Sequence, residues 1–266
     1  MSLHRFFLDE QVLSAEEGRT FELRLSDEDL RHARVLRLSP GEHIAVVDAS
    51  GDYFECRVES TGNPLVASVA SRLGCPEPPF RITLYQALAK GDKMETVVRH
   101  ATEVGACAFV PFASSRSVVR LDASKAARKR DRWSSIARSA AMQSGRGLVP
   151  EVSDVNTFRQ ACEGLGRYDA VVVFWEEASC EDTIARALER VKDTPDADVA
   201  VVVGPEGGLS ESEVEAVLAS NKAASVASLG PSILRTETAG IVGCALVFYE
   251  LGGMGGGPCP TEGRAC

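Results

Sequence analysis

The sequence lacks the cysteine and histidine spacings of a metal site. Its eight cysteines include no C-x-x-C pair, and none of its four histidines stands at zinc-ligand spacing from a cysteine. We therefore expect no metal and no disulfide framework. Cysteines such as Cys107, which lies in an Ala-Cys-Ala-Phe-Val run, are predicted to be free thiols that pack as small hydrophobes in a reducing cytosol.

Long hydrophobic runs are missing as well. The N-terminus carries Arg5 and Asp9 where a signal peptide would have an apolar core. The longest uncharged apolar stretch, residues 238–249, is bounded by glutamates and is too short to span a bilayer. These features predict a cytoplasmic protein that is not associated with a membrane.

Two common nucleotide-binding signatures are also absent. The chain has no G-x-G-x-x-G after a predicted strand and no G-x-x-x-x-G-K-[ST], which argues against ordinary dinucleotide binding and P-loop chemistry. The four histidines form no convincing catalytic triad, because His100, for example, lies in the middle of a predicted helix. The chemistry must therefore be sought elsewhere in the chain.

The 266 residues, 44% of them hydrophobic, are enough for one large and one small domain. Residues 1–74 alternate short strand patterns with turns and predict a small β-rich domain with one helix at 26–38. The chain breakers of residues 74–79 place a boundary before a second domain at 80–251. Residues 252–266, with six glycines and two prolines, are expected to form a flexible tail.

In the second domain, apolar strand patterns alternate with helical ones. This order is typical of an α/β fold, a parallel sheet with helices on both faces. The predicted strands are 82–88, 108–111, 170–174, 199–203 and 226–229, and the predicted helices are 92–104, 123–144, 181–191, 211–219 and 238–251. Asp92 and Glu95 have the spacing of a capping box at the start of the first helix.

The chain is acidic overall but contains one basic segment. Its net charge of -9 by itself argues against a nucleic-acid partner, because phosphates repel an acidic surface. Residues 116–146, here called the basic segment, hold nine basic and two acidic residues, so their charge of +7 leaves -16 for the rest. The segment is either a contact for RNA or phosphate or the solvated face of a helix.

The clearest local motif runs through residues 199–213 and reads as strand, glycine loop and helix. The β-branched run before Gly204 is typical of a strand buried on both faces, and Ser210 and Glu213 have capping-box spacing. Ligands of open α/β sheets bind at the carboxyl ends of strands, where this loop lies. A plain tight turn is the alternative interpretation.

A second junction of the same kind follows at residues 228–239. The apolar Ile233 and Leu234 are candidates for lining an adenine pocket, and polar residues follow just before a helix. In the alternative, Arg235 and Glu237 form a structural ion pair and Thr236 is the N-cap of the helix.

Taken as an ordered set, these motifs resemble a known family. Residues 203–208 (Val-Gly-Pro-Glu-Gly-Gly) and 229–239 (Leu-Gly-Pro-Ser-Ile-Leu-Arg-Thr-Glu-Thr-Ala) are similar to the paired cofactor loops of the SPOUT, or α/β-knot, methyltransferases. They resemble in particular the family that methylates uridine N3 in small-subunit ribosomal RNA. Residues 4–7 and 32–41 are similar to that family's PUA-like RNA-binding domain, and 91–95 and 143–146 also match.

The resemblance implies a SPOUT domain whose last strand and helix thread through a preceding loop as a trefoil knot, with a small PUA-like domain before it. It implies S-adenosylmethionine as cofactor, a homodimer formed through the knotted domain, and ribosomal RNA of the small subunit as partner. The implied cofactor-binding residues are Val203, Gly204, Pro205, Glu206, Gly207, Gly208, Leu229, Gly230, Ile233, Leu234 and Thr236.

Catalysis requires that uridine N3 lose its proton and that the resulting anion be stabilised, for which Arg235 and Glu237 are the candidates. Candidate RNA-binding residues are Arg5, Arg31, Arg34, Arg37, Lys93, Arg116 and Arg146. Three alternatives remain open: another RNA substrate such as transfer RNA, a noncatalytic RNA-binding assembly factor, and an unrelated α/β enzyme that binds a phosphate ligand.

Overall fold

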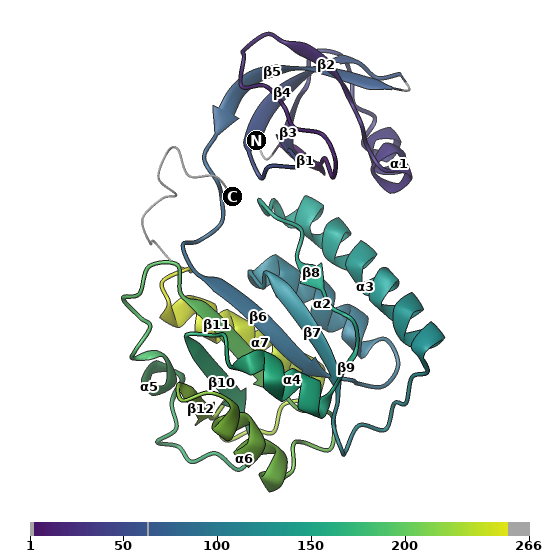
Figure 1. The fold of residues 1–266 in the computed structure, drawn as a ribbon. Coiled ribbons are helices and arrows are strands. Elements are labelled where there is room, and N and C mark those ends of the chain that lie inside the picture. Colours follow the sequence, from purple (N-terminus) through teal and green to yellow (C-terminus); the bar gives the residue numbers. More distant parts are fainter. Residues whose placement is uncertain (1–2, 63, 255–266) are drawn as a thin grey trace. The chain divides into compact units, whose positions relative to one another are not determined.

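The computed structural model describes residues 3–62 and 64–254, and they divide into two compact units. Of the described residues, the smaller unit comprises those up to Glu77 together with Ala141–Val149, and the larger comprises Pro78–Ala140 and Pro150–Met254. Most of the expected flexible tail, residues 255–266, lies outside the described residues. Figure 1 shows the elements of each unit.

The smaller unit is built on a five-stranded sheet with strand order β1-β3-β4-β5-β2. Its strands are β1 (His4–Phe7), β2 (Thr20–Leu23), β3 (His43–Val47), β4 (Tyr53–Ser60) and β5 (Leu65–Leu73). Only the β1–β3 pair is parallel among them. The predicted helix is present as α1 (Asp27–Leu36), and Ser26 caps it by accepting a hydrogen bond from the Asp29 amide.

The larger unit contains a seven-stranded parallel sheet in the order β12-β10-β11-β6-β7-β8, with β9 also paired to β7. Its strands are β6 (Arg81–Ala87), β7 (Ala108–Ala113), β8 (Glu151–Val152), β9 (Asn156–Thr157), β10 (Ala170–Phe174), β11 (Asp198–Val203) and β12 (Ala224–Ala227). Its helices are α2 (Lys93–Val104), α3 (Ala123–Ser144), α4 (Phe158–Leu165), α5 (Ile184–Leu188), α6 (Glu211–Ser220) and α7 (Thr236–Glu250). The last four residues of α3, from Ala141, belong to the smaller unit.

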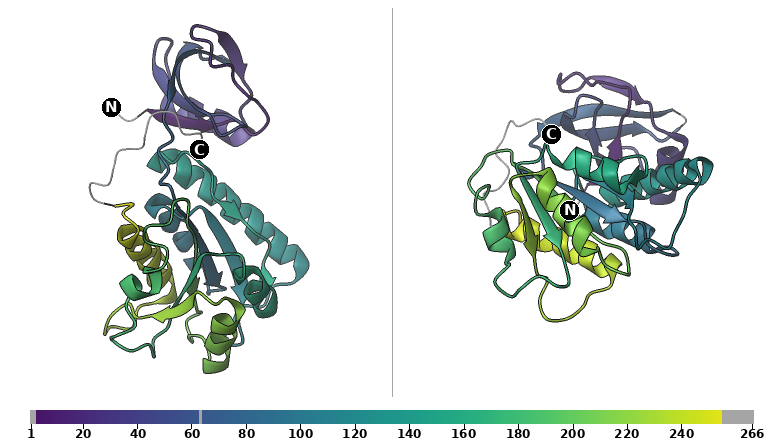
Figure 2. Two further views of the ribbon diagram at one scale, coloured as in Figure 1. Left: turned by 60° about the vertical axis from the view of Figure 1, so that its left-hand side comes forward. Right: turned by 60° about the horizontal axis from the view of Figure 1, so that its bottom comes forward.

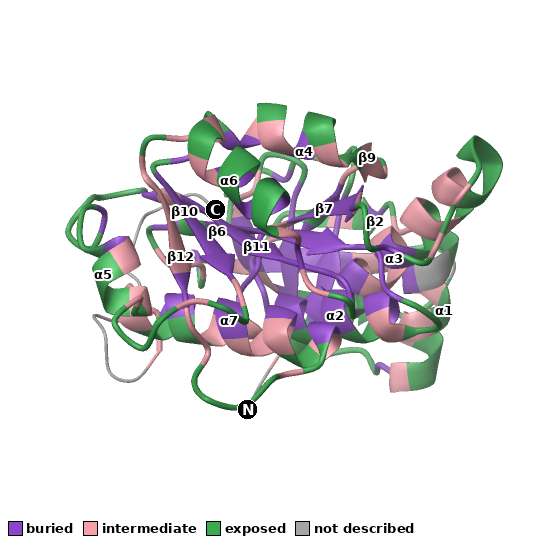
Figure 3. Ribbon diagram, turned by 90° about the horizontal axis from the view of Figure 1, so that it is seen from below, coloured by how far each residue is buried: buried purple, intermediate pink, exposed green. Residues whose placement is uncertain are grey.

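Side chains of the central strands alternate between two hydrophobic cores. Val172 and Val201 pack with residues of α2, α5 and α7 on one face, whereas Val171 and Val202 pack with residues of α4 and α6 on the other. The predicted helices on both faces of a parallel sheet are therefore confirmed. Figure 2 shows α7, in yellow, along one face of the sheet, and Figure 3 shows the central strands as buried.

The ends of several elements differ from the prediction. The prediction of a capping box at Asp92 is wrong. Asp92 has a φ of -96° and a ψ of 11° rather than an extended backbone, and its side chain makes no capping hydrogen bond. The helix expected at 181–191 is only Ile184–Leu188. The pattern also gave no sign of α4, which Thr157 and Gln160 start with a capping box.

The last helix begins two residues earlier than predicted, at Thr236, and its N-cap is Arg235. Thr236 is therefore not the N-cap. Its hydroxyl is instead used in long-range hydrogen bonds, because it lies beside the carboxyl end of β6 and the loop after β11. Such contacts between distant segments cannot be deduced from local capping rules.

The described cysteines Cys56, Cys107, Cys162, Cys180 and Cys244 are free. Burial raises the pKa of the Cys56 and Cys244 thiols to about 12, so both stay protonated as small apolar groups. Cys75 departs from the expectation, because it is disulfide-bonded. None of the helices in the described residues is long and apolar enough to cross a membrane.

Candidate functional site

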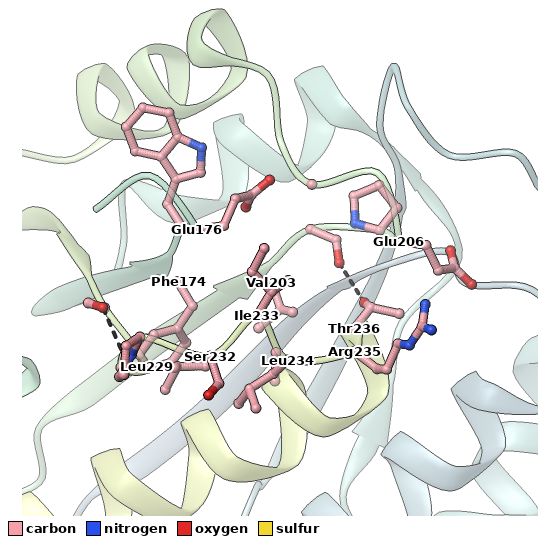
Figure 4. Close-up of a pocket in the computed structure, with 18 residues that line it drawn as sticks. Phe174, Glu176, Val203, Glu206, Leu229, Ser232, Ile233, Leu234, Arg235 and Thr236 are labelled. Atoms are coloured by element: carbon pink, nitrogen blue, oxygen red, sulfur yellow. Dashed lines mark hydrogen bonds between the residues drawn. The ribbon is translucent and has the colours of Figure 1, made fainter. Parts of the chain in front are cut away.

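A pocket of about 320 Å³ lies where β10, β11 and β12 end. These strands are parallel neighbours, so the loops that follow them meet at one edge of the sheet, as Figure 4 shows. Two of these loops are named here: the first pocket loop is residues 204–210, between β11 and α6, and the second pocket loop is residues 228–235, between β12 and α7.

Most of the residues expected to bind a cofactor line this pocket. They are Val203, Gly204, Pro205, Glu206, Gly208, Leu229, Gly230, Ile233, Leu234 and Thr236. Gly207 and Glu237 are not in the lining, whereas Arg235 is. The two glycine motifs of the sequence are thus brought together in one cavity.

The first pocket loop is held tightly by its own turn and by the helix that follows. The Gly208 amide donates to the Pro205 carbonyl oxygen over 3.0 Å, and Gly208 has a φ of +66°, which favours glycine. A Cβ on Gly204 would lie 2.9 Å from the Leu209 nitrogen, so this position also needs glycine. The predicted capping box between Ser210 and Glu213 is confirmed at the start of α6.

A neighbouring loop supports the first pocket loop from outside. The Arg116 guanidinium donates to the carbonyl oxygens of Gly207 over 3.0 Å and of Leu209 over 3.4 Å. The Ser115 amide donates to the Glu213 carboxylate over 2.7 Å. These bonds fix the loop after β7 to the second half of the first pocket loop and to the start of α6.

A chain of buried hydrogen bonds joins β6, α7 and the first pocket loop. The Gln86 side-chain amide donates to the Thr236 hydroxyl over 2.9 Å, and that hydroxyl donates to the Gly204 carbonyl oxygen over 2.6 Å. Gln86 and Thr236 are both buried. The Gln86 side-chain oxygen has no hydrogen-bond partner among the described residues, but hydrogen bonds are strong in a low-dielectric interior, so these two fix the start of α7 against the pocket.

Lys93 forms ion pairs with two carboxylates at the rim of the site. Its ammonium lies 3.0 Å from Glu206 and 3.2 Å from Glu237, and the Lys90 amide also donates to Glu206 over 3.0 Å. The hydrogen bond to Glu206 raises the pKa of Lys93. Burial alone would raise the pKa of Glu206, but the backbone amides and Lys93 lower it. The alternative of an ion pair between Arg235 and Glu237 is therefore replaced by a pair between Lys93 and Glu237.

The second pocket loop has few contacts of its own. Ile233 is 87% exposed, and Pro231 and Ser232 are exposed as well. The Gly230 amide donates to the Ser228 hydroxyl over 3.2 Å. Among the described residues, no hydrogen bond or ion pair engages the Arg235 side chain, which is exposed at the pocket. The polar end of Arg235 is thus available to a bound molecule.

Several lining residues were missed by reading the sequence. They are Phe174, Trp175, Glu176, Ser228, Pro231, Ser232 and Ala239. The signal that would have found the first three was their position at the end of the predicted strand at 170–174 or directly after it. This strand lies next to the one that precedes the glycine loop. Without a sheet order, neither strand could be assigned a neighbour.

The expected RNA-binding residues are divided between the two units. Arg31, Arg34 and Arg37 are exposed on the smaller unit. Arg5 and Arg146 are buried there: the Arg5 guanidinium stacks on Tyr53, and Arg146 forms an ion pair with Glu77 at 2.7 Å. On the larger unit, Lys93 and Arg116 make the contacts described above. Within the described ranges, no group of His, Cys, Asp or Glu side chains is arranged to hold a metal.

Comparison with known proteins agrees with this architecture. Residues 76–248 match a family model of the RNA methyltransferase domain, and residues 25–69 match one of the RNA methyltransferase PUA domain. The ribosomal RNA small subunit methyltransferase E of Bacillus subtilis is 35% identical over 252 residues, which are 93% of this chain and 97% of that protein. The protein of the same name from Mycobacterium bovis is 34% identical over 83% of each chain.

Among solved structures, the fold matches ribosomal RNA small subunit methyltransferase E of Neisseria gonorrhoeae, which was crystallised with S-adenosyl methionine. That structure has a TM-score of 0.77 and 30% identity, covering 93% of this chain and 97% of its own. The expected SPOUT fold with a small PUA-like domain is confirmed. The chain belongs to the RNA methyltransferase family that includes the proteins named ribosomal RNA small subunit methyltransferase E.

Proposed function

We propose that this protein transfers a methyl group from S-adenosylmethionine to N3 of a specific uridine in small-subunit ribosomal RNA, in the cytoplasm. The observation that supports it most is the pocket formed by the strand-end loops. The chain that contains this pocket matches a protein named ribosomal RNA small subunit methyltransferase E along almost its whole length.

The residues that line the pocket are suited to this cofactor. Leu229, Ile233 and Leu234 offer an apolar surface to a purine ring. Gly230 has a φ of +99° and no atom within 4 Å of where its Cβ would be, so the backbone there is open to a ligand. The cofactor, when bound, supplies a methyl group on a positively charged sulfur, which is the electrophile of the reaction.

We propose that Arg235 contacts the uracil ring that is methylated. Uridine N3 becomes nucleophilic only after it loses its proton, and the negative charge then spreads onto the flanking carbonyl oxygens. An arginine at the pocket stabilises that charge with oriented N–H donors, and the Arg235 guanidinium is exposed there. Glu237 is held by Lys93, and we assign it the role of positioning the start of α7.

The Arg235→Ala variant tests the assignment. We expect methyl transfer to fall by at least about 100-fold, as for the loss of a charge-stabilising donor, while the cofactor dissociation constant measured by calorimetry changes little. Arg235→Lys keeps the charge without the planar group and should recover part of the activity. Equal losses of cofactor binding and activity would instead make Arg235 a binding or structural residue.

The target itself is tested by offering different RNA pools to the purified protein. Assembled small subunits, free small-subunit ribosomal RNA and transfer RNA are each incubated with labelled S-adenosylmethionine, and the modified nucleoside is identified by mass spectrometry. A 3-methyluridine in small-subunit ribosomal RNA is the expected product. Methylation of transfer RNA alone, or of another atom of the base, would contradict the proposal.

For RNA binding we propose the exposed arginines of the smaller unit. Arg34 and Arg37 line a groove of about 350 Å³ beside Leu30 and Ala33, and Arg31 is exposed on the same helix. Each phosphate contact adds to the salt dependence of binding. Arg34→Glu with Arg37→Glu should weaken RNA binding and reduce the slope of affinity against salt by about 2. An unchanged slope would remove both residues from the interface.

We further propose a homodimer through the larger unit. Leu246 and Tyr249 of α7 are large hydrophobic side chains, yet they are 39% and 64% exposed. Exposed apolar side chains on a buried-type helix favour a protein partner. Light scattering should give twice the mass of one chain, and Leu246→Glu with Tyr249→Glu should give a monomer.

A further inference from the structure

One acidic side chain of the pocket has no partner in the described residues. The lining contains two carboxylates, Glu176 and Glu206. Glu206 is balanced by Lys93 at 3.0 Å and by the Lys90 amide. Among the residues that the structure describes, no hydrogen bond or ion pair engages Glu176, which is exposed toward the cavity.

The position of Glu176 is fixed by its strand and by a glycine. It is the second residue after β10, and its carboxylate lies directly against Gly208 of the first pocket loop. A Cβ added at Gly208 would overlap that carboxylate. Figure 4 shows Glu176 on the side of the pocket opposite Ser232 and Leu234. The negative charge thus faces the apolar surface formed by the second pocket loop.

We propose that Glu176 binds the α-ammonium group in the methionine half of S-adenosylmethionine, an inference that depends on the proposed function. A purine that packs on Leu229, Ile233 and Leu234 leaves the other half of the molecule on the side of Glu176. A carboxylate without a counter-ion in a partly enclosed pocket is stabilised more by a cation than by a neutral donor. Glu176 then supplies an unpaired negative charge, whereas the carboxylate of the first pocket loop, Glu206, is already paired with Lys93.

A competing role for a carboxylate in such a pocket is to accept hydrogen bonds from the two ribose hydroxyl groups. The two roles differ in what they require of the ligand. An ammonium contact is lost when the amino-acid half is absent, whereas a ribose contact is kept. Ligands that share the adenosine part but differ in the amino-acid part therefore separate them.

The test is calorimetry of the full chain and of Glu176→Gln with three compounds. S-adenosylmethionine has both the ammonium and the sulfonium charge, S-adenosylhomocysteine keeps only the ammonium, and 5′-methylthioadenosine has neither. We expect Glu176→Gln to bind the first two roughly tenfold more weakly, the effect of losing one charged hydrogen bond at a partly exposed site. Binding of 5′-methylthioadenosine should change by less than about twofold.

Glu177→Gln is the matched control, because Glu177 is the adjacent exposed glutamate and does not line the pocket. It should bind all three compounds as the unchanged chain does. Glu176→Asp, which keeps the charge on a shorter side chain, should recover part of the lost affinity. An unchanged thermal unfolding midpoint of Glu176→Gln shows that the pocket is folded.

Equal weakening of all three compounds would assign Glu176 to the ribose or to the shape of the pocket and overturn the proposal. Weakening of S-adenosylmethionine alone would point to the sulfonium, and no weakening would remove Glu176 from the site; both also overturn it. If the unchanged chain binds none of the three compounds, the proposed function fails instead. The two failures are therefore distinguishable.

Discussion

The two pocket loops have similar sequences but differ in how the rest of the protein holds them. Each follows a strand with Gly-Pro and precedes a helix. The first pocket loop is held by Arg116, by Thr236 and by Lys93 through Glu206. The second pocket loop leaves Ile233 87% exposed.

This difference indicates that the two loops have different roles in ligand binding. A loop fixed before a ligand arrives loses little conformational entropy on binding, whereas an exposed loop is ordered at a cost when it closes on the ligand. We infer that the first pocket loop is a preformed part of the site and that the second pocket loop adapts to what is bound. Three experiments test this contrast.

The largest effect is expected at Gly204, where the new Cβ would meet backbone atoms 2.9 to 3.1 Å away. Backbone cannot rotate out of the way, so Gly204→Ala should lower the free energy of unfolding by about 1–3 kcal/mol and disturb the pocket. Gly230→Ala puts an alanine at a φ of +99°, which is strained, but nothing lies within 4 Å of its Cβ. Because the exposed loop can rearrange to relieve the strain, we expect a smaller loss of about 1 kcal/mol. Denaturant unfolding measures both. Equal losses of unfolding free energy in the two variants would show that the loops are equally constrained.

An intermediate effect is expected at Arg116. Arg116→Ala removes the donors to Gly207 and Leu209, and we expect the cofactor dissociation constant to rise about three- to tenfold. Arg120→Ala, at an exposed position of the same basic segment, is the control and should leave the cofactor dissociation constant unchanged. If instead RNA affinity falls and cofactor affinity does not, Arg116 serves RNA directly rather than the first pocket loop.

The smallest effect on the free protein is expected at Ile233. Because this side chain is 87% exposed, Ile233→Ser should change the free energy of unfolding by no more than about 0.5 kcal/mol. It should still weaken cofactor binding roughly three- to tenfold, since closing the loop would bury this apolar side chain. Calorimetry measures the cofactor affinity of this variant, and an unchanged affinity would mean that Ile233 stays exposed in the bound state.

Much of the site was predictable from the sequence because its signals are local. The β-branched run before Gly204, the glycines of both loops and the Ser210–Glu213 capping box are each contained within a few residues, and the structure has all of them at one edge of the sheet. The resemblance to a known family added the fold class and the cofactor to these patterns.

The roles of single charged residues were less predictable. Arg146, as part of the basic segment, and Lys93 were predicted to contact RNA, but Arg146 is buried on Glu77 and Lys93 pairs with Glu206 and Glu237. Their partners are far away in the sequence. Composition and periodicity carry no information about which distant charge a folded chain brings within 4 Å.

The sequence by itself determined the alternation of strands and helices, the glycine loops and the family. Only the tertiary structure decided that the loop after β10 contributes Glu176 to the same pocket and that Gln86 fixes Thr236 to Gly204. The physical reason is the order of strands in the sheet. Hydrophobic periodicity predicts that a strand exists, whereas its neighbours are chosen by the packing of the whole domain.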